Sequence, residues 1–585
     1  MRRRLWIMGL VGSIAIGLGG PMGMSGAEDA GVTIVALYQA DVPVTLDAAV
    51  SSEISTLDPA LASDTVSLTP IENLFLGLTD VDPFTNEVVP ELAKSWVVND
   101  DGTVWTFQLR SDVNWMRYDP ASETAGVVRP VVADDFVYGI KRTCDPRLGG
   151  YYGTVAAKVI SGCDIINQTP ANGLTDDLVY GDTIKVRALD EQTLEITLQF
   201  PAAFFFAMTP MWMLRPVPAE VIQDYGDEWT APGNIVTNGP FFIQELTRGL
   251  QRVFVRNDAL PNDLFGYRSN LERVVQLVIE DQGTSFALYI DNKIDAAGVP
   301  PAELQNVLAS PDFEGEVRQV FDLSVFYFGF IQDKPPFDNV QVRRAFSAII
   351  DRQAFINQVR GGRGIPMIHF TPTGIAYAPP INEIGVGFDP EFAKDQLARG
   401  GYGNCEGLPN ITIATYTGAG TWAEFLVSSA EEYLGCDPTL FTIEQFEFSV
   451  LLEAIAPDVY GDERPNMFTL GWGPGYGDAH SWLTDVLSCT ALNRFRRQCS
   501  SVDDLMDAAA RSNDPEVRTM LYAEIEEGFF GVRGEYPIVP LFLRSDFVLI
   551  KAWYTAPFET DALFGGTHWN AQTIDMAAKL AARAG

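Results

Sequence analysis

Strand-like and helix-like segments alternate along almost the whole 585-residue chain. VWTFQL at 104–109 and LEITL at 194–198 alternate between apolar and polar residues, which is typical of half-buried strands. Further β-rich runs lie between Phe241 and Phe330, and MFTL at 467–470 is also strand-like. Because both kinds of segment are mixed throughout, the sequence predicts α/β lobes and not a sandwich or a helix bundle.

One long helix is predicted at 342–359, where apolar residues recur at helical spacing. Asp338 or Asn339 would cap its start. Arg343 and Arg344 are expected to be solvated or paired, because long basic side chains on a helix usually face water.

The first 27 residues are predicted to be a secretory signal peptide. Arg2 to Arg4 precede a mostly apolar run from Leu5 to Leu18, and the small residues around Ala27 suit cleavage. This run is too short to span a bilayer, which takes about 20 residues. No cysteine lies near the cleavage point, so we expect export to the periplasm without a lipid anchor.

Six cysteines fall into three pairs that are close in sequence, which in an exported protein predicts three disulfides. The pairs are Cys144 with Cys163, Cys405 with Cys436, and Cys489 with Cys499. Each disulfide would stabilise the fold by roughly 2 to 4 kcal/mol. The competing interpretation is a metal site, but the sequence has no CxxC and 3 histidines. We therefore predict no metal and no cofactor.

The charge balance excludes one class of partner. Acids number 77 and bases 40, which gives a formal net charge of −37. Such a surface repels nucleic acid and anionic lipid, so we expect no nucleic-acid partner.

The sequence offers little that is typical of an enzyme. GxSxG, HExxH and GxxxxGK[ST] are absent. Carboxylates are dispersed, so no pair suggests glycoside hydrolysis, although a secreted glycoside or peptide hydrolase stays open as an alternative. A surface adhesin would show repeats or an anchor, and the sequence shows neither. We predict that the chain is not an enzyme.

The segment LGWGPGYGDAHSWL at 470–483 has the composition of a binding loop. Its four glycines allow close approach of the backbone to a ligand. Trp472, Tyr476 and Trp482 supply flat apolar faces, and Asp478 supplies a charge. The alternative is a glycine-rich surface turn packed under two tryptophans.

Several motifs, in order along the chain, carry a resemblance to a known family. They are LDPA at 57–60, VVADDFVYGIKR at 131–142, NGPFFI at 238–243, PFDNVQVRRAFSAIIDRQAFI at 336–356 and YPIVPLF at 536–542. With them the chain resembles the extracytoplasmic solute-binding proteins of family 5, the dipeptide, oligopeptide and nickel-binding group of ABC importers. The resemblance covers nearly the whole mature chain.

The resemblance implies an α/β, two-lobed periplasmic-binding-protein type II fold that bends at a hinge and has an extra domain in its first lobe. The implied parts are a signal peptide at 1–27, domain I at 28–75, 198–310 and 540–585, domain II at 76–197 and domain III at 311–539. The ligand would lie between the lobes.

The resemblance also implies where an extended ligand would be clamped. Backbone hydrogen bonds from both lobes would hold it by β-addition, largely independent of its side chains. The implied positions are Ser63, Asp64 and Thr65 in the first lobe, and Gly471, Trp472 and Gly473 in the second.

One position departs from the peptide-binding pattern. In peptide-binding relatives an aspartate three residues after this tryptophan holds the α-ammonium of the peptide, and here the position is Gly475. Asp478 could substitute for it, or could brace the loop or cap a helix. Tyr476 is a further candidate contact. The missing acid makes oligosaccharides an alternative ligand.

Trp422 and His480 leave alternatives open. Trp422 follows a glycine-rich loop after the strand-like ITIATY, where α/β sheets bind ligands, but it could instead fill the core. His480 lies two residues after Asp478, and a loop histidine bonded to backbone is expected more than a metal-chelating pair.

The sequence therefore predicts a monomeric periplasmic solute-binding component of an ABC importer. It would capture a peptide or an oligosaccharide, close over it and deliver it to a permease in the cytoplasmic membrane.

Overall fold

One 11-stranded sheet forms the framework of the fold. In this computed structural model of the chain, the described residues are 42–584 except 381, 382, 460, 462, 463, 474, 492, 562 and 565. The predicted signal peptide at 1–27 lies outside the described residues. All that follows concerns the unit from Val44 onward.

The strand order is β11-β12-β13-β1-β14-β20-β15-β19-β17-β18, and β16 pairs with β20. The strands are β1 (Thr45–Val50), β11 (Phe241–Thr247), β12 (Gln251–Arg256), β13 (Arg273–Val278), β14 (Ala296–Gly298), β15 (Val317–Phe330), β16 (Ile365–Pro366), β17 (Ile411–Tyr416), β18 (Phe441–Phe446), β19 (Met467–Trp472) and β20 (Ile538–Ile550). We call the part around β1 and β11–β14 the first lobe, and the part around β16–β19 the second lobe.

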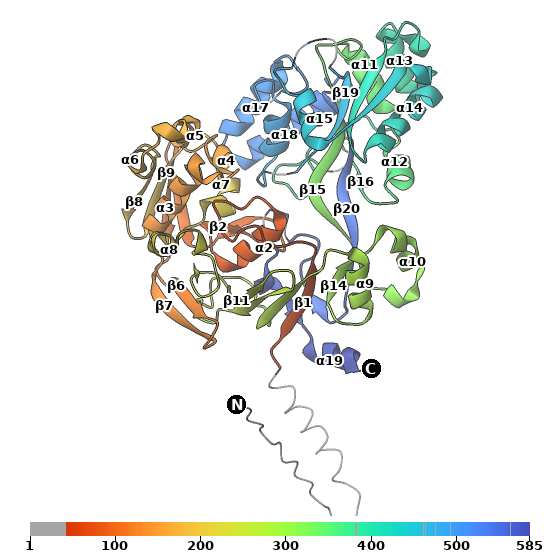
Figure 1. The fold of residues 1–585 in the computed structure, drawn as a ribbon. Helices are drawn as coiled ribbons and strands as arrows, with labels where there is room; N and C mark the ends of the chain where they lie inside the picture. The colour runs from red at the N-terminus through yellow and green to blue at the C-terminus, as the bar shows by residue number, and fades with distance from the viewer. Residues whose placement is uncertain are drawn as a thin grey trace, which may run out of the picture. The chain divides into compact units, whose positions relative to one another are not determined.

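Strands β15 and β20 belong to both lobes. They pair antiparallel from Val317↔Leu549 to Gly329↔Ile538, and the register shifts between Phe321 and Val325. Figure 1 shows these two strands crossing from one lobe to the other. The lobes are thus connected by paired backbone.

Four smaller sheets complete the strands. They are β4-β5-β9-β8, β10-β6-β7, β2-β3 and β21-β22. Their strands are β2 (Thr79–Val81), β3 (Val88–Pro90), β4 (Ala93–Val98), β5 (Val104–Leu109), β6 (Asn114–Asp119), β7 (Thr124–Pro130), β8 (Val186–Asp190), β9 (Thr193–Thr197), β10 (Val236–Thr237), β21 (Tyr554–Thr555) and β22 (Thr573–Ile574). The predicted strands at 104–109 and 194–198 are confirmed by β5 and β9, and β5 buries Trp105, Phe107 and Leu109 at alternate positions.

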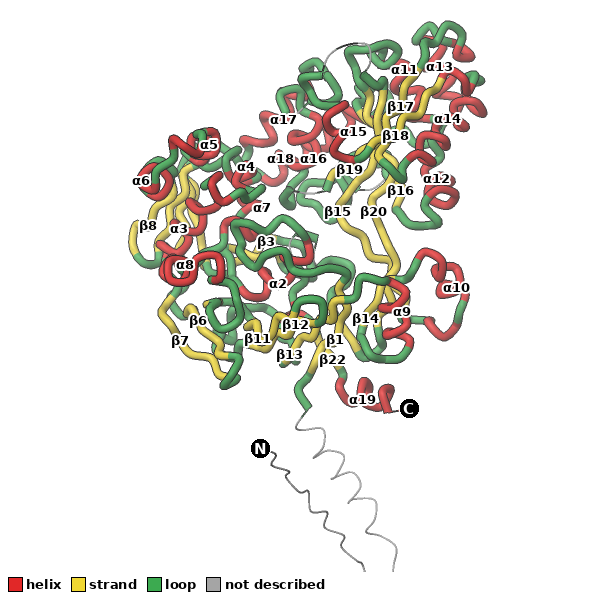
Figure 2. The backbone as a smooth tube through the Cα atoms, viewed as in Figure 1, coloured by secondary structure: helices red, strands yellow, loops and turns green. Residues whose placement is uncertain are grey.

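Helices cover the sheets in both lobes (Figure 2). In the first lobe they are α2 (Thr65–Leu74), α3 (Ala133–Cys144), α4 (Gly153–Ala156), α5 (Cys163–Gln168), α6 (Asp176–Tyr180), α7 (Phe205–Met208), α8 (Ala219–Tyr225), α9 (Gln282–Ile290), α10 (Leu304–Ala309) and α19 (Met576–Ala584). In the second lobe they are α11 (Val340–Ala348), α12 (Arg352–Val359), α13 (Pro390–Arg399), α14 (Gly420–Leu434), α15 (Phe448–Ala454), α16 (His480–Trp482), α17 (Ser501–Arg511) and α18 (Pro515–Phe530). No helix of the described residues is long and apolar enough to cross a membrane.

The second lobe has a core on each face of its sheet. Along β15, Val325 and Tyr327 lie in one core together with residues of α17 and α18. Phe328 and Phe330 lie in the other core with residues of α11 to α14. Burial on both faces explains why the second-lobe part of this strand, VFYFGF at 325–330, is apolar without interruption.

The single helix predicted at 342–359 is wrong, because two helices, α11 and α12, cover this segment. Asn339 caps the first as predicted, and its side chain accepts a hydrogen bond from Gln341 N. Asp351 caps the second by accepting from Ala354 N. Arg343 is buried and donates to the carbonyls of Phe337 and Glu535, so it is paired and not solvated.

The cap of α12 yields a stability prediction. Asp351→Ala should lower the free energy of unfolding by about 1 kcal/mol, because the Ala354 N–H loses its acceptor. Asp351→Asn keeps a capping oxygen and serves as the control. Denaturant unfolding of the purified variants measures the difference, and equal stability of the alanine and asparagine variants would refute the capping argument.

Candidate ligand-binding site

Three strands of the second lobe end at the same edge of the sheet. β17 runs parallel to both β18 and β19, so their carboxyl ends lie together. α/β sheets bind ligands outside such ends. The loop that begins at Trp472, where β19 ends, therefore starts at the edge where a ligand is expected.

At the end of β19, the backbone of Gly471 and Trp472 is held by strand pairing, while Trp472 and Gly473 remain partly or fully exposed. β19 pairs with β15 through Val325↔Trp472 and Phe326↔Gly471. A Cβ on Gly471 would lie 2.6 Å from the Phe326 ring, so glycine is needed there for packing. Trp472 is half-buried and Gly473 is exposed. The indole Nε1 is buried without a hydrogen-bond partner among the described residues.

Gly475 has space for a side chain. Its N–H donates to Ser481 Oγ at 3.1 Å, and an added Cβ would meet nothing closer than that oxygen at 3.4 Å. Its φ lies outside the left-handed region. The absence of an acid at this position is therefore not imposed by the backbone.

Asp478 braces the loop from inside. It is buried and forms a two-point ion pair with Arg518, with both N–O distances 2.8 Å. It also accepts a hydrogen bond from His480 N at 2.9 Å. Since its carboxylate is already paired and buried, the structure favours loop bracing over contact with a ligand ammonium.

Tyr476 and His480 are buried against the first lobe. Tyr476 Oη donates to Asp485 Oδ2 at 3.0 Å and lies 2.6 Å from His480 Nδ1. The rings of Tyr476 and His480 both stack on Phe204, with centroid distances of 5.5 and 3.8 Å. Burial raises the pKa of Tyr476 well above its ordinary value and lowers that of His480.

Residues 63–65 lie at the start of α2 in the first lobe. Ser63 and Thr65 are exposed, and Asp64 caps the helix by accepting from Ser67 N at 2.9 Å. Burial works to raise the pKa of Asp64, but hydrogen bonds from Ser55 and Ser67 outweigh it and lower the pKa. Among the residues that the structure describes, no hydrogen bond joins this segment to the 470s loop.

Trp422 does not join the other candidates. It is 4% exposed and makes edge contacts with the rings of Phe326, Phe355, Tyr416 and Phe542. The structure favours the core alternative, because Trp422 lies on the apolar face of α14 that packs into the core of the second lobe.

Sequence reasoning missed a group of residues that faces the loop across the lobes. Phe204 contacts Tyr476, Ala203 N donates to Ala510 O at 2.9 Å, and Lys158 Nζ lies 3.3 Å from Asp485 Oδ1. The aromatic run FPAAFFFAM at 200–208 was the one available signal.

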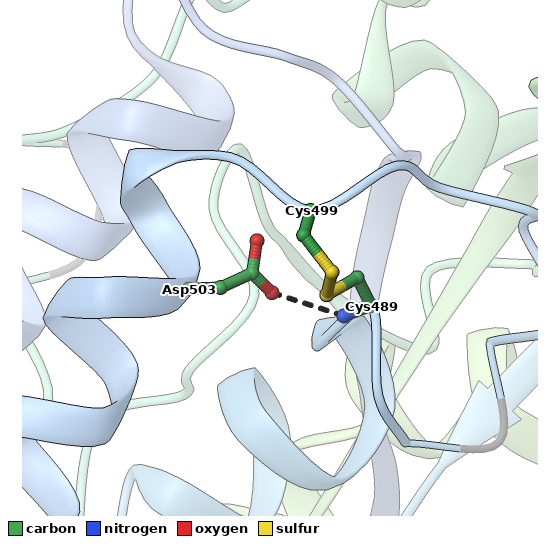
Figure 3. Close-up of side chains that lie close together, drawn as sticks. All are labelled: Cys489, Cys499 and Asp503. Carbon is green, nitrogen blue, oxygen red and sulfur yellow. Dashed lines mark hydrogen bonds between the residues drawn. A yellow bond between two sulfur atoms is a disulfide. The ribbon is translucent and has the colours of Figure 1, made fainter.

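All three predicted disulfides are formed. Figure 3 shows Cys489–Cys499 beside Asp503, which accepts a hydrogen bond from Cys489 N at 3.0 Å. These three residues have the proximity of a metal site. The sulfurs are bonded to each other, however, and therefore present no thiolate ligand.

A second cluster of possible ligands lies in the first lobe, where Asp80 and His568 are buried and Glu72 is half-buried. His568 Nδ1 lies 2.7 Å from Asp561 and Nε2 lies 3.1 Å from Asp80. Burial works to lower the pKa of His568, but Asp80 and the other carboxylates outweigh it and hold that pKa well above its usual range. A charged imidazole between two carboxylates is a structural ion network and has no free nitrogen for a metal.

Comparison with known proteins settles the family. Residues 87–494 match the bacterial extracellular solute-binding proteins, family 5 (middle). The chain belongs to this family. It is 28% identical to the periplasmic oligopeptide-binding protein OppA of Escherichia coli over 508 residues, which are 86% of this chain and 87% of OppA. It is also 28% identical to the probable deoxycholate-binding periplasmic protein YgiS of Escherichia coli over 539 residues, 89% of this chain and 94% of YgiS.

A solved structure supports the same assignment. An unliganded open form of the periplasmic murein tripeptide-binding protein MppA is 25% identical and has a TM-score of 0.76, covering 91% of this chain and 97% of MppA. This match confirms the predicted two-lobed type II fold of family 5. The relatives give no support to the oligosaccharide alternative.

Asp478 provides a test of loop bracing. Asp478→Asn should lower the free energy of unfolding by about 3 kcal/mol even without ligand, because Arg518 is left buried beside a neutral group. The exposed Asp504→Asn on α17 is the matched control. Thermal unfolding of the ligand-free protein measures the loss, and a variant as stable as the control would contradict bracing.

Proposed function

We propose that this family 5 protein is the periplasmic component of an ABC importer that captures peptides between its lobes and delivers them to a membrane permease. The observation that carries the proposal is the position of Trp472 and Gly473, half-buried and exposed, at the carboxyl edge of the second-lobe sheet. The oligopeptide-binding protein OppA, similar over most of the chain, supports peptides as the ligand class.

Peptide capture would rely on backbone groups and flat apolar faces. We infer that residues 63–65 and 471–473 pair with an extended peptide from opposite lobes, as the sequence resemblance implies. Tyr476 and Asp478 would act by holding the loop in place, since both are buried and paired within the protein. The proposed activity is binding without turnover by a monomer with the domain division given above, and closure over the ligand would bury the contacts.

Native mass spectrometry of the protein purified from the periplasm tests the ligand class. We expect adduct masses that fragment into amino-acid residues. Adducts of sugars or bile acids, or an empty protein whose melting temperature no peptide raises, would overturn the proposal.

Trp472 should contribute directly to affinity. Trp472→Ala should weaken binding of a co-purified peptide by about 1 to 3 kcal/mol, because a large apolar face is lost. Trp472→Phe, which keeps a flat face, should lose less. Isothermal titration gives the affinities, and lost stability with unchanged affinity would make Trp472 a core residue instead.

An acid introduced at position 475 should create an ammonium contact. Gly475→Asp fits the available space and should tighten binding of peptides with a free amino terminus by about tenfold. N-acetylated peptides should not gain. Gly475→Asn has the same size without the charge, so equal affinities of the two variants would show that position 475 does not face the peptide amino terminus.

A further inference from the structure

A cavity of about 250 Å³ lies between the first lobe and the loop that follows β19. Its apolar wall comes from the first lobe and includes Val155, Phe200, Phe204 and Met208. Its polar wall comes mainly from the second lobe and includes His480, Thr484 and Asp485, with the exposed Asp507 and Arg511 as an oppositely charged pair of residues in the lining. The cavity therefore joins an apolar surface of the first lobe to polar and charged groups, and the first lobe contributes one of these, Lys158.

The polar wall contains hydrogen-bond groups that the described protein does not satisfy. Tyr476 Oη donates its proton to Asp485, so the 2.6 Å contact with His480 Nδ1 requires Nδ1 to be the donor. Burial keeps the imidazole neutral by lowering the pKa of His480, and Nε2 is then an acceptor. Nε2 has no partner among the described residues, and Thr484 Oγ1 is buried without one.

Asp485 supplies negative charge to this wall. Its side chain is 13% exposed, and its Oδ1 lies 3.3 Å from Lys158 Nζ. The Lys158 side chain is 57% exposed. An ion pair with one partner in water is weak, because the lysine loses little when it returns to solvent. Lys158 therefore places a displaceable ammonium group on Asp485.

Asp485 also faces the loop proposed to bind the ligand. It lines a second cavity of about 10 Å³ together with Trp472 and Arg494. This volume is near the size of a single water. Asp485 lines both cavities and thus lies between Trp472 and the larger one. It offers this part of the loop a negative charge, which Gly475 does not.

We propose that the larger cavity binds a primary ammonium group carried on an apolar stem, with Asp485 as its counter-charge and Lys158 as the ammonium it displaces. His480 Nε2 and Thr484 Oγ1 would accept the remaining N–H donors, and the stem would lie against Phe200, Phe204 and Met208. The proposal rests on the proposed function, since it names the part of a peptide-like ligand that this protein recognises: an amino terminus or a lysine-like side chain.

Three small probes of equal chain length test the charge preference: hexylamine, hexanol and hexanoate. Saturation-transfer NMR titrations should show hexylamine binding about 10- to 100-fold more tightly than hexanol, since a hydrogen bond to a charged group is stronger than a neutral one. Hexanoate should bind most weakly. Equal binding of hexylamine and hexanol, or a preference for hexanoate, would overturn the proposal.

Paired variants assign the preference to Asp485. Asp485→Asn should abolish it, whereas Asp507→Asn, the same change at an exposed acid on the cavity rim, should keep it. Lys158→Gln removes the competing ammonium and should tighten hexylamine binding several-fold. If Asp485→Asn does not fold, the lysine variant decides, because unchanged or weaker binding of hexylamine would contradict displacement.

Titration of peptides distinguishes failure of the amine-binding cavity from failure of the proposed function. Trialanine and N-acetyl-trialanine are titrated into the same proteins. Peptide binding together with no amine preference would refute the role of Asp485 and leave peptide capture intact. An amine preference without any peptide binding would support the cavity and count against peptides as the ligand.

Discussion

The antiparallel pairing of β15 with β20 holds the two lobes together and positions the strands beside it. Both strands continue from one lobe into the other, so a single sheet includes strands of both. Their register shifts between Phe321 and Val325, where the ladder is interrupted. A ladder interruption between lobes is a natural place for bending, because few hydrogen bonds must change there.

The same pairing places the loop after β19. β19 is held against β15 through Val325↔Trp472, and beyond that pair the chain leaves the sheet. The buried Asp478–Arg518 pair and the Tyr476–Asp485 hydrogen bond then fix the far end of the loop. Trp472 and Gly473, between these anchors, keep accessible groups, which suits the proposed contact with a ligand because a segment fixed in advance loses little freedom on binding.

Much of the fold was predictable because its signals are local. Strands such as β5 show period-two burial, and the three disulfides join cysteines that are close in sequence. The loop after β19 stays a predicted ligand contact, for which glycines and aromatics directly after a strand were the signal.

Two kinds of feature could not be predicted from the sequence: ion pairs between residues far apart in the chain, and the choice between one long helix and two short ones. Asp478 is paired with Arg518, 40 residues further on, and Asp485 is paired with Lys158, 327 residues before it. The helix predicted at 342–359 is divided because the Asp351 side chain accepts a hydrogen bond from Ala354 N and so starts a second helix. Helical spacing of apolar residues continues across this break and does not reveal it. Trp422 follows a strand at the edge of the sheet where ligands bind, but its side chain is buried in the core. The sequence is the same in both cases, and the burial of the side chain decides between them.

The proposed function requires the two lobes to close around a peptide. Small-angle X-ray scattering tests it most directly, by comparing the radius of gyration of the purified protein before and after addition of saturating peptide. We expect a smaller radius of gyration with peptide, accompanied by a higher melting temperature. An unchanged radius, with no peptide raising the melting temperature, would contradict it.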